Sequence, residues 1–86
     1  MSKLLFGEKA WEDLSYWMDH DPKTMKHIRK LLRDIGRNSF KGIGKPEPLK
    51  GDLRGSWSRR IDDTHRLVYR VKGDTIEILS CRGHYE

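Results

Sequence analysis

Apolar residues recur at helical spacing along two adjacent segments near the start of the chain. Residues 8–19 carry one stripe, and acidic residues favour the first turns of a helix there. Residues 22 to about 36 carry a second stripe after Asp21-Pro22, which supplies an N-cap and a proline at the first helical position. The two stripes consist of Trp11, Leu14 and Met18, and of Met25, Ile28, Leu32 and Ile35. So short a turn between the helices predicts an antiparallel hairpin.

Short apolar runs and alternating residues predict strands on both sides of this hairpin. Residues 3–6 form one run, which Gly7 ends, and the run is long enough for a brief strand. Residues 56–62, 65–71 and 75–81 predict three more strands, joined by tight turns.

The segment between the helices and these strands, residues 38–55, contains four glycines and two prolines. Loops of this length inside compact domains are commonly functional or disordered, and the prolines and scattered apolar residues favour order here. We expect an ordered irregular loop with a short strand near Leu53. The two prolines flank Glu47 and hold its backbone stiff and extended.

Turn lengths set the expected register of the last three strands. A two-residue loop at Gly73-Asp74 gives the pairs Val71–Ile76, Tyr69–Ile78 and Leu67–Ser80. The face towards the helices then holds Leu67, Tyr69, Val71, Ile76 and Ile78, and the free face holds Arg66, Val68, Arg70, Glu77, Leu79 and Cys81. A three-residue loop before His65 sets Arg60 opposite Arg66, whereas a two-residue loop separates these arginines. The longer loop also adds three residues to the core side: Trp57, Arg59 and Ile61.

These elements predict an α+β fold in which an N-terminal strand and a helical hairpin pack on one face of a twisted, mainly antiparallel sheet. Apolar residues make up 35% and charged residues 36% of the chain, which is typical of a globular protein with a modest core. We expect residues 1–86 to form a single domain, because 86 residues leave little room for a second core.

The chain is basic, with 18 Lys and Arg against 13 Asp and Glu and a formal net charge of +5. This balance suits a negatively charged partner, such as nucleic acid or an acidic protein, and it equally suits a solvated surface with no partner. We expect neither a secretion signal nor a membrane span, because no apolar run is long enough. Cys81 is the only cysteine, so no internal disulfide can form, and a cytoplasmic location is expected.

One carboxylate, two arginines and a histidine-tyrosine pair are expected to gather at the free face of the sheet. Arg60 and Arg66 share that face in the register above, and Glu47 lies in the loop that enters the sheet. The chain beyond the last strand returns beside the start of the strand that carries Arg66. It thereby brings His84 and Tyr85 to the same surface.

This set of residues suits the cleavage of a phosphodiester bond in RNA. The reaction needs a base for the 2′-hydroxyl, an acid for the departing 5′-oxygen and a cation for the charge that develops on the phosphate. Glu47 or His84 suits either proton transfer, and each such transfer is worth roughly 10²–10⁴-fold in rate. Arg66 presents a planar fork of donors that matches phosphate oxygens. No His, Cys or carboxylate cluster has the spacing of a metal site, so we expect no metal and no cofactor.

Two other interpretations fit the same residues. Arg66 could pair with Glu77 or Asp62 and serve only the fold. A non-catalytic basic module could bind RNA or an acidic protein through the same charges, because phosphate contacts give affinity without chemistry. The combination of Glu47 with Arg66 and His84 favours an enzyme, since a carboxylate repels the phosphates that a simple binder must hold.

Four stretches of the chain also carry specific motifs: Gly44–Lys50 (GKPEPLK), Trp57–Ile61 (WSRRI), His65–Tyr69 (HRLVY) and Cys81–Tyr85 (CRGHY). They resemble the YoeB (Txe) toxins, which belong to the wider RelE-like group of toxin–antitoxin modules. The resemblance covers nearly the whole chain, including the N-terminal strand and the Trp-rich first helix.

The resemblance implies a microbial-RNase-like fold and a ribosome-dependent mRNA interferase. Such an endoribonuclease cuts messenger RNA in the A site of the 70S ribosome without metal, leaving a 2′,3′-cyclic phosphate and a 5′-hydroxyl. It implies Glu47 as the general base and His84 as the general acid. Arg66, assisted by Arg60, would stabilise the transition state, and Tyr85 would help to hold the substrate. RNA contacts are expected at Lys50, Arg59 and Trp57.

The implied partner is a YefM-like antitoxin, whose acidic C-terminal segment folds over the toxin and masks the site. A homodimer is a further expectation, and operator DNA would be bound only through the toxin–antitoxin complex. Two positions depart from the family pattern. Gly83 stands where an aromatic residue is common, and Glu86 extends a chain that often stops at the tyrosine. Both lie at the end of the chain that carries the expected acid.

Overall fold

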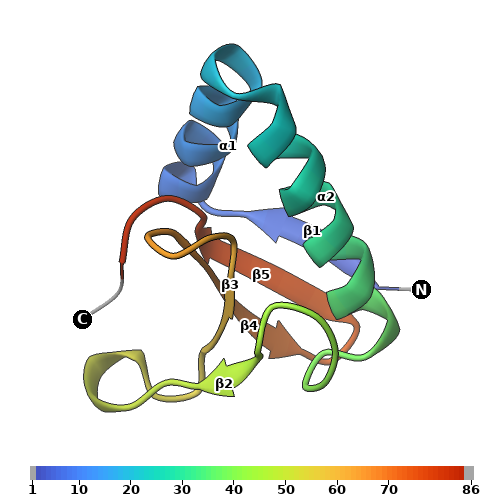
Figure 1. Cartoon of the computed structure of the whole chain (residues 1–86). Coiled ribbons are helices and arrows are strands. Elements are labelled where there is room, and N and C mark those ends of the chain that lie inside the picture. The colour runs from blue at the N-terminus through green and yellow to red at the C-terminus, as the bar shows by residue number, and fades with distance from the viewer. Residues whose placement is uncertain (1, 85–86) are drawn as a thin grey trace.

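Two helices pack on one face of a five-stranded sheet in the computed structural model, which describes residues 2–84 (Figure 1). In chain order the elements are β1 (Lys3–Phe6), α1 (Glu8–His20), α2 (Pro22–Arg37), β2 (Glu47–Pro48), a 3₁₀ turn (Gly51–Leu53), β3 (Trp57–Arg60), β4 (Arg66–Lys72) and β5 (Thr75–Ser80). The predicted α+β class, with a helical hairpin on one face of the sheet, is confirmed. Neither helix in this part of the chain is long and apolar enough to cross a membrane.

The second helix of the hairpin begins at the predicted cap. The carboxylate of Asp21 accepts hydrogen bonds from the backbone N–H of Thr24 at 3.2 Å and from its hydroxyl at 2.7 Å. Pro22 occupies the first turn, where its missing N–H would have no helical partner in any case. The side of α2 that faces the sheet buries Ile28, Leu31, Leu32 and Ile35.

The buried stripe of α1 differs from the predicted one. Trp11 and Met18, both predicted in the stripe, are 56% and 45% exposed. Leu14 is buried as predicted, and Ala10 and Trp17 complete the stripe that faces the core. Two apolar stripes overlap at Leu14 in the sequence, and helical spacing alone does not decide which of them meets the sheet.

The strands run in the order β1-β5-β4-β3-β2, with β1 parallel to β5 and every other pair antiparallel. The mainly antiparallel sheet is therefore confirmed. The prediction of a short strand near Leu53 is wrong, because the 3₁₀ turn forms there. Pairing occurs earlier instead, where Glu47 faces Ser58 and Pro48 faces Trp57. Pro48 has no N–H to donate, and a strand at the edge of a sheet tolerates that loss.

A β-bulge changes the predicted faces at the end of β5. The predicted pairs nearest the turn are confirmed, namely Val71–Ile76 and Tyr69–Ile78. Beyond them Ser80 faces Val68 rather than Leu67, because two steps along β5 match one step along β4. The extra residue, Leu79, moves the residues after it to the other face. Cys81, predicted on the free face, is therefore fully buried in the core with the helices.

Burial should make the Cys81 thiol unreactive in the folded protein. Desolvation, with a smaller effect of the Asp13 carboxylate, raises its pKa from 9.0 to about 12. Because the thiolate is the reactive form, the native protein at pH 8 should react with a thiol reagent about 10³-fold more slowly than the urea-unfolded chain. Absorbance after addition of a disulfide reagent measures both rates. Equal rates would contradict the burial of this side chain.

Arg59 is fully buried and holds the loop between α2 and β2 in place. Its guanidinium forms an ion pair with Asp34 and donates to the hydroxyl of Tyr69 at 3.2 Å. It also donates to three loop carbonyls, those of Asn38 at 2.7 Å, Lys41 at 3.0 Å and Ile43 at 3.2 Å. These five bonds match the five N–H donors of the side chain. The predicted contact of Arg59 with RNA is therefore wrong, because no donor remains for a phosphate.

Two glycines let this loop pass close to the core, and the predicted order of the loop is confirmed. Gly42 has φ of 131°, and a Cβ there would lie 1.9 Å from a carboxylate oxygen of Asp34. Gly44 has φ of 81°, and a Cβ there would lie 3.1 Å from atoms of both Arg59 and Arg60. The backbone N–H of Arg60 donates to the carbonyl of Gly44 at 2.7 Å. The loop thus delivers the chain to β2 along a fixed path.

Candidate active site

The sheet register brings three predicted site residues to one face. Strands β2, β3 and β4 lie side by side (Figure 1). Glu47 faces Ser58 across the first pair, and Arg60 faces Arg66 across the second, as the longer of the two predicted loops requires. Ser58 and Arg60 are two positions apart on β3 and so point to the same face. Glu47, Arg60 and Arg66 therefore project from the face opposite the helices.

The C-terminal segment returns to the start of β4, as predicted, and brings His84 beside Arg66. The backbone N–H of Arg66 donates to the carbonyl of Gly83 at 3.0 Å. The N–H of Gly83 in turn donates to the ring nitrogen Nδ1 of His65 at 2.8 Å. His84 follows directly and is exposed. Tyr85, predicted to hold the substrate, lies outside the described residues.

The sequence did not identify His65 as part of this region. The contact joins positions 18 residues apart, and the local signals were the place of His65 directly before Arg66 and at the start of the HRLVY motif. The ring of His65 and the backbone N–H of Arg66 thus tie Gly83, and with it the segment that carries His84, to the start of β4.

The guanidinium of Arg66 contacts backbone carbonyls rather than a carboxylate. Its Nη1 donates to the carbonyl of Asp62 at 3.0 Å and to that of His65 at 3.2 Å. No ion pair within residues 2–84 includes Arg66, and Glu77 instead lies 3.8 Å from Arg70. The alternative in which Arg66 pairs with a carboxylate and serves only the fold is therefore not supported. Its other guanidinium nitrogens can turn to a phosphate.

The carboxylate of Asp62 shapes the turn before β4. It accepts hydrogen bonds from the backbone N–H of His65 at 2.6 Å and from that of Thr64 at 2.8 Å. Although desolvation opposes the effect, these bonds hold the pKa of Asp62 below its usual value of 3.8. The carboxylate stays ionised at neutral pH and fixes the turn from which Arg66 emerges.

Of the two remaining predicted RNA contacts, one lies apart from this group. Trp57 belongs to the side of β3 that packs against the core, and its ring lies 4.8 Å from that of Phe40. It does not share a face with Glu47 and Arg66. Lys50 is exposed just after β2, within three residues of Glu47, so a role in holding RNA stays a prediction.

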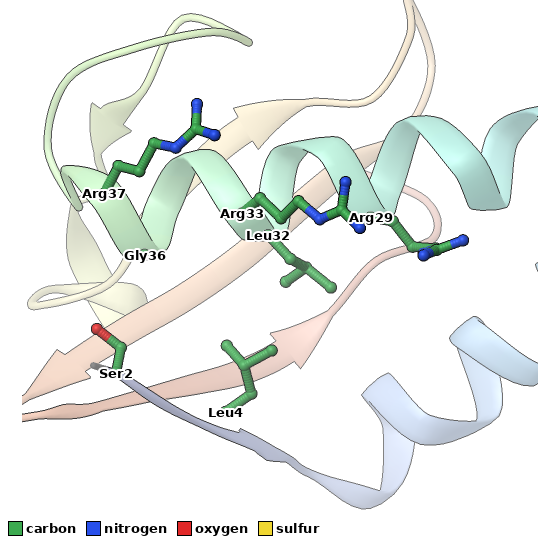
Figure 2. Close-up of a pocket in the computed structure, with 7 residues that line it drawn as sticks. All are labelled: Ser2, Leu4, Arg29, Leu32, Arg33, Gly36 and Arg37. Carbon is green, nitrogen blue, oxygen red and sulfur yellow. The ribbon is translucent and has the colours of Figure 1, made fainter.

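A separate groove of about 490 Å³ lies between β1 and α2 (Figure 2). Three arginines of α2, spaced one helical turn apart, line it: Arg29, Arg33 and Arg37. Leu4 and Leu32 point towards each other across its floor (Figure 2). The groove contains none of the predicted catalytic residues. A row of positive charges beside an apolar strip suits the binding of an acidic amphipathic segment rather than a reaction.

The described residues of the site carry the kinds of group that proton transfer and charge stabilisation require. Glu47 offers a carboxylate, His84 an imidazole, and Arg60 and Arg66 two guanidinium groups on one face. Within residues 2–84, no three or more His, Cys, Asp or Glu side chains lie close enough together to hold a metal ion.

Comparison with known proteins identifies a family that matches nearly the whole chain. Residues 6–85 match the family described as the YoeB-like toxin of bacterial type II toxin–antitoxin systems. The chain is 54% identical over 83 residues to Toxin YoeB of Streptomyces coelicolor, a match that covers 96% of this chain and 99% of the relative. It is 52% identical over 85 residues to Toxin RelK of Mycobacterium tuberculosis, covering 99% of this chain and 100% of the relative.

Solved structures of similar fold extend the comparison. A YoeB/ParE toxin from Agrobacterium tumefaciens superposes with a TM-score of 0.92 at 45% identity, covering 96% of this chain and 99% of that chain. A heterotetrameric YoeB–YefM toxin–antitoxin complex from Staphylococcus aureus gives 0.91 at 46% identity, covering 99% of both chains. A YoeB dimer from Staphylococcus aureus also gives 0.91, at 47% identity and 98% coverage of both.

Proposed function

The chain belongs to the YoeB-like toxins of bacterial type II toxin–antitoxin systems, and on this basis we propose that it is a ribosome-dependent mRNA interferase. It cuts messenger RNA in the ribosomal A site. We place this activity in the cytoplasm, where translating ribosomes lie, and assign it to one domain formed by residues 1–86. One observation supports the proposal: Glu47, Arg60 and Arg66 share a sheet face, and the backbone N–H of Arg66 binds Gly83, the residue before His84.

The proposed reaction is attack of the 2′-oxygen of RNA on the adjacent phosphorus. Glu47 takes the proton of the 2′-hydroxyl while the O2′–P bond forms. The P–O5′ bond breaks, and the protonated ring of His84 gives a proton to the leaving oxygen. The products are a 2′,3′-cyclic phosphate and a 5′-hydroxyl. Each of these two proton transfers contributes roughly 10²–10⁴-fold to the rate.

The two arginines stabilise the negative charge that develops on the phosphate. Arg66 uses the donors that its two carbonyl contacts leave available, and these donors strengthen their bonds as negative charge grows on the phosphate oxygens. Arg60 stands opposite on β3 and assists from the second side. Lys50 and Tyr85 are proposed to hold the RNA chain.

A non-catalytic basic module remains the second candidate, because the positive charge of the chain serves binding as well as cleavage. The position of Glu47 favours the enzyme. A carboxylate on the same face as Arg60 and Arg66 repels a bound phosphate, and a base is the role that makes use of it.

Loss of either proton-transfer group should slow cleavage without weakening binding. Glu47→Gln and His84→Ala should each lower the single-turnover rate about 10²–10⁴-fold, while affinity for ribosomes changes little. Quench-flow cleavage on ribosomes loaded with mRNA gives the rate, and pelleting gives the affinity. Glu12→Gln and His27→Ala, at exposed helix positions, are the matched controls. Equal losses of rate and affinity would assign both groups to binding rather than to proton transfer.

The partner that we propose is a YefM-like antitoxin. The heterotetrameric complex of the Staphylococcus aureus relative is a complex with YefM, and another solved structure of that relative is a dimer. We propose that this chain likewise binds an acidic antitoxin, can form a homodimer, and reaches operator DNA only within the toxin–antitoxin complex. The arginine groove between β1 and α2 offers positive charge and an apolar floor to an acidic amphipathic segment of the antitoxin.

Charge reversal in this groove should weaken the antitoxin complex. Arg33→Glu should lower the affinity for the antitoxin about tenfold or more at low salt, with a smaller loss at high salt, because salt screens charge pairs at the surface. Calorimetric titration at two salt concentrations measures the change. Lys23→Glu makes the same charge change on α2 at an exposed position away from the groove. Equal effects of the two variants would point to net charge rather than to the groove.

A further inference from the structure

His65 joins the start of β4 to the C-terminal segment through its side chain. Its Nδ1 accepts a hydrogen bond from the N–H of Gly83 at 2.8 Å, while the N–H of Arg66 donates to the Gly83 carbonyl at 3.0 Å. Both polar backbone groups of Gly83 are therefore held by two consecutive residues. His84, the proposed general acid, comes immediately after this double contact.

The ring of His65 is itself held in one orientation. The indole of Trp17, buried on α1, meets the imidazole edge to face, with ring centroids 4.9 Å apart and planes at 80°. The backbone N–H of His65 donates to the carboxylate of Asp62 at 2.6 Å. The same Trp17 donates from Nε1 to the carbonyl of Cys81 at 2.8 Å. One buried indole thus fixes both the imidazole and the chain segment that the imidazole contacts.

The rest of the segment is anchored up to Gly83. The N–H of Cys81 donates to the Asp13 carboxylate at 3.0 Å, and the guanidinium of Arg82 lies 3.5 Å from the ring centroid of Tyr16. Gly83 has φ of 90°, a left-handed conformation that turns the chain. His65 supplies the last side-chain contact before this turn, so it governs where the following residue begins.

We propose that His65 is a positioning residue, whose neutral imidazole tethers Gly83 and so sets the reach of His84 towards the leaving oxygen. The assignment deepens the proposed function and rests on it. Nδ1 can accept from an N–H only when the ring is neutral and the proton sits on Nε2. A protonated ring would present an N–H to the N–H of Gly83, and the tether would open.

The test compares His65→Asn with His65→Ala. The side-chain oxygen of Asn can take the place of Nδ1 and does not titrate, whereas Ala has no acceptor. His65→Ala should lower the single-turnover cleavage rate about 10²-fold, since small displacements of a catalytic group cost that much, and ribosome affinity should hold. His65→Asn should recover most of the rate. His27→Ala, an exposed imidazole on α2, should behave as the parent chain.

A second measurement decides the tether without any cleavage assay. Hydrogen exchange of the Gly83 amide, followed by NMR and corrected for intrinsic rates, should show protection in the parent chain and in His65→Asn, and none in His65→Ala. Equal protection in all three chains, or equal cleavage defects in the Asn and Ala variants, would overturn the proposal. A parent chain that cleaves nothing would refute the interferase instead, and the exchange data would still decide the tether.

Discussion

Arg66→Ala should lower the rate of RNA cleavage by about 10²–10³-fold, because it removes the donors aimed at the charge that develops on the phosphate. The fold should survive the change. The side chain lies on the free face of the sheet, and its contacts within residues 2–84 are to the backbone carbonyls of Asp62 and His65 in one surface turn. The backbone N–H that binds Gly83 remains in the variant.

The matched control for this prediction is Arg70→Ala. Arg70 lies further along β4 on the same face as Arg66, and its Nη1 is 3.8 Å from Oε1 of Glu77. Its loss should leave cleavage within a few-fold of the parent rate. Arg66→Lys should recover only part of the activity, since a point charge replaces a planar fork. A similar loss in Arg70→Ala, or unfolding of Arg66→Ala by circular dichroism, would contradict the assigned role.

Arg59→Ala should cost about 3–5 kcal/mol of folding free energy, because it empties a fully buried position and removes five hydrogen bonds. It leaves Asp34 without its guanidinium and three loop carbonyls without a donor. Urea unfolding followed by fluorescence measures the loss. Arg60→Ala is the matched control on the next residue, which is exposed, and should cost no more than about 0.5 kcal/mol. Equal stability of the two variants would contradict the structural role of Arg59.

The same network should make the fold sensitive to acid. The pKa of Asp34 lies below its usual value of 3.8, mainly because its carboxylate accepts a hydrogen bond from the backbone N–H of Ile43. The hydrogen bond from Arg59 is the second cause. A carboxyl whose pKa is lower in the folded state stabilises the protein above its unfolded pKa, and the stability is lost as pH falls through the folded value. The contribution of Asp34 should therefore be present near neutrality and disappear in the acid range below about pH 4.

Local signals predicted the helices and most of the register. Asp21-Pro22 marks the start of α2, and the two-residue turn at Gly73-Asp74 sets Tyr69 against Ile78. The longer of the two loops left open before His65 sets Arg60 against Arg66. The shared face of the two arginines followed from those pairings. These features depend on residues close together in the sequence, where caps, spacing and turn chemistry determine structure.

Contacts between distant residues were not predictable in the same way. The bulge at Leu79 adds one residue to a strand without a local signature, and it reverses the face of Cys81. The alternation of residues along the strand predicted Arg59 on the core side, yet a contact with RNA was also predicted for it. In the structure its buried guanidinium donates instead to loop carbonyls that lie 16 to 21 residues earlier in the chain. The contact between His65 and Gly83 likewise depends on how the chain end folds back.

The measurement that tests the central claim most directly is an analysis of RNA ends. The toxin, freed from its antitoxin, is added to ribosomes stalled on a defined mRNA, to the mRNA alone, and to a parallel reaction with Arg66→Ala. We predict cuts in the A-site codon that require the ribosome, leave a 2′,3′-cyclic phosphate and a 5′-hydroxyl, and disappear in the variant. Tight ribosome binding without cuts, or fragments that end in a 3′-hydroxyl and a 5′-phosphate, would contradict the proposed interferase.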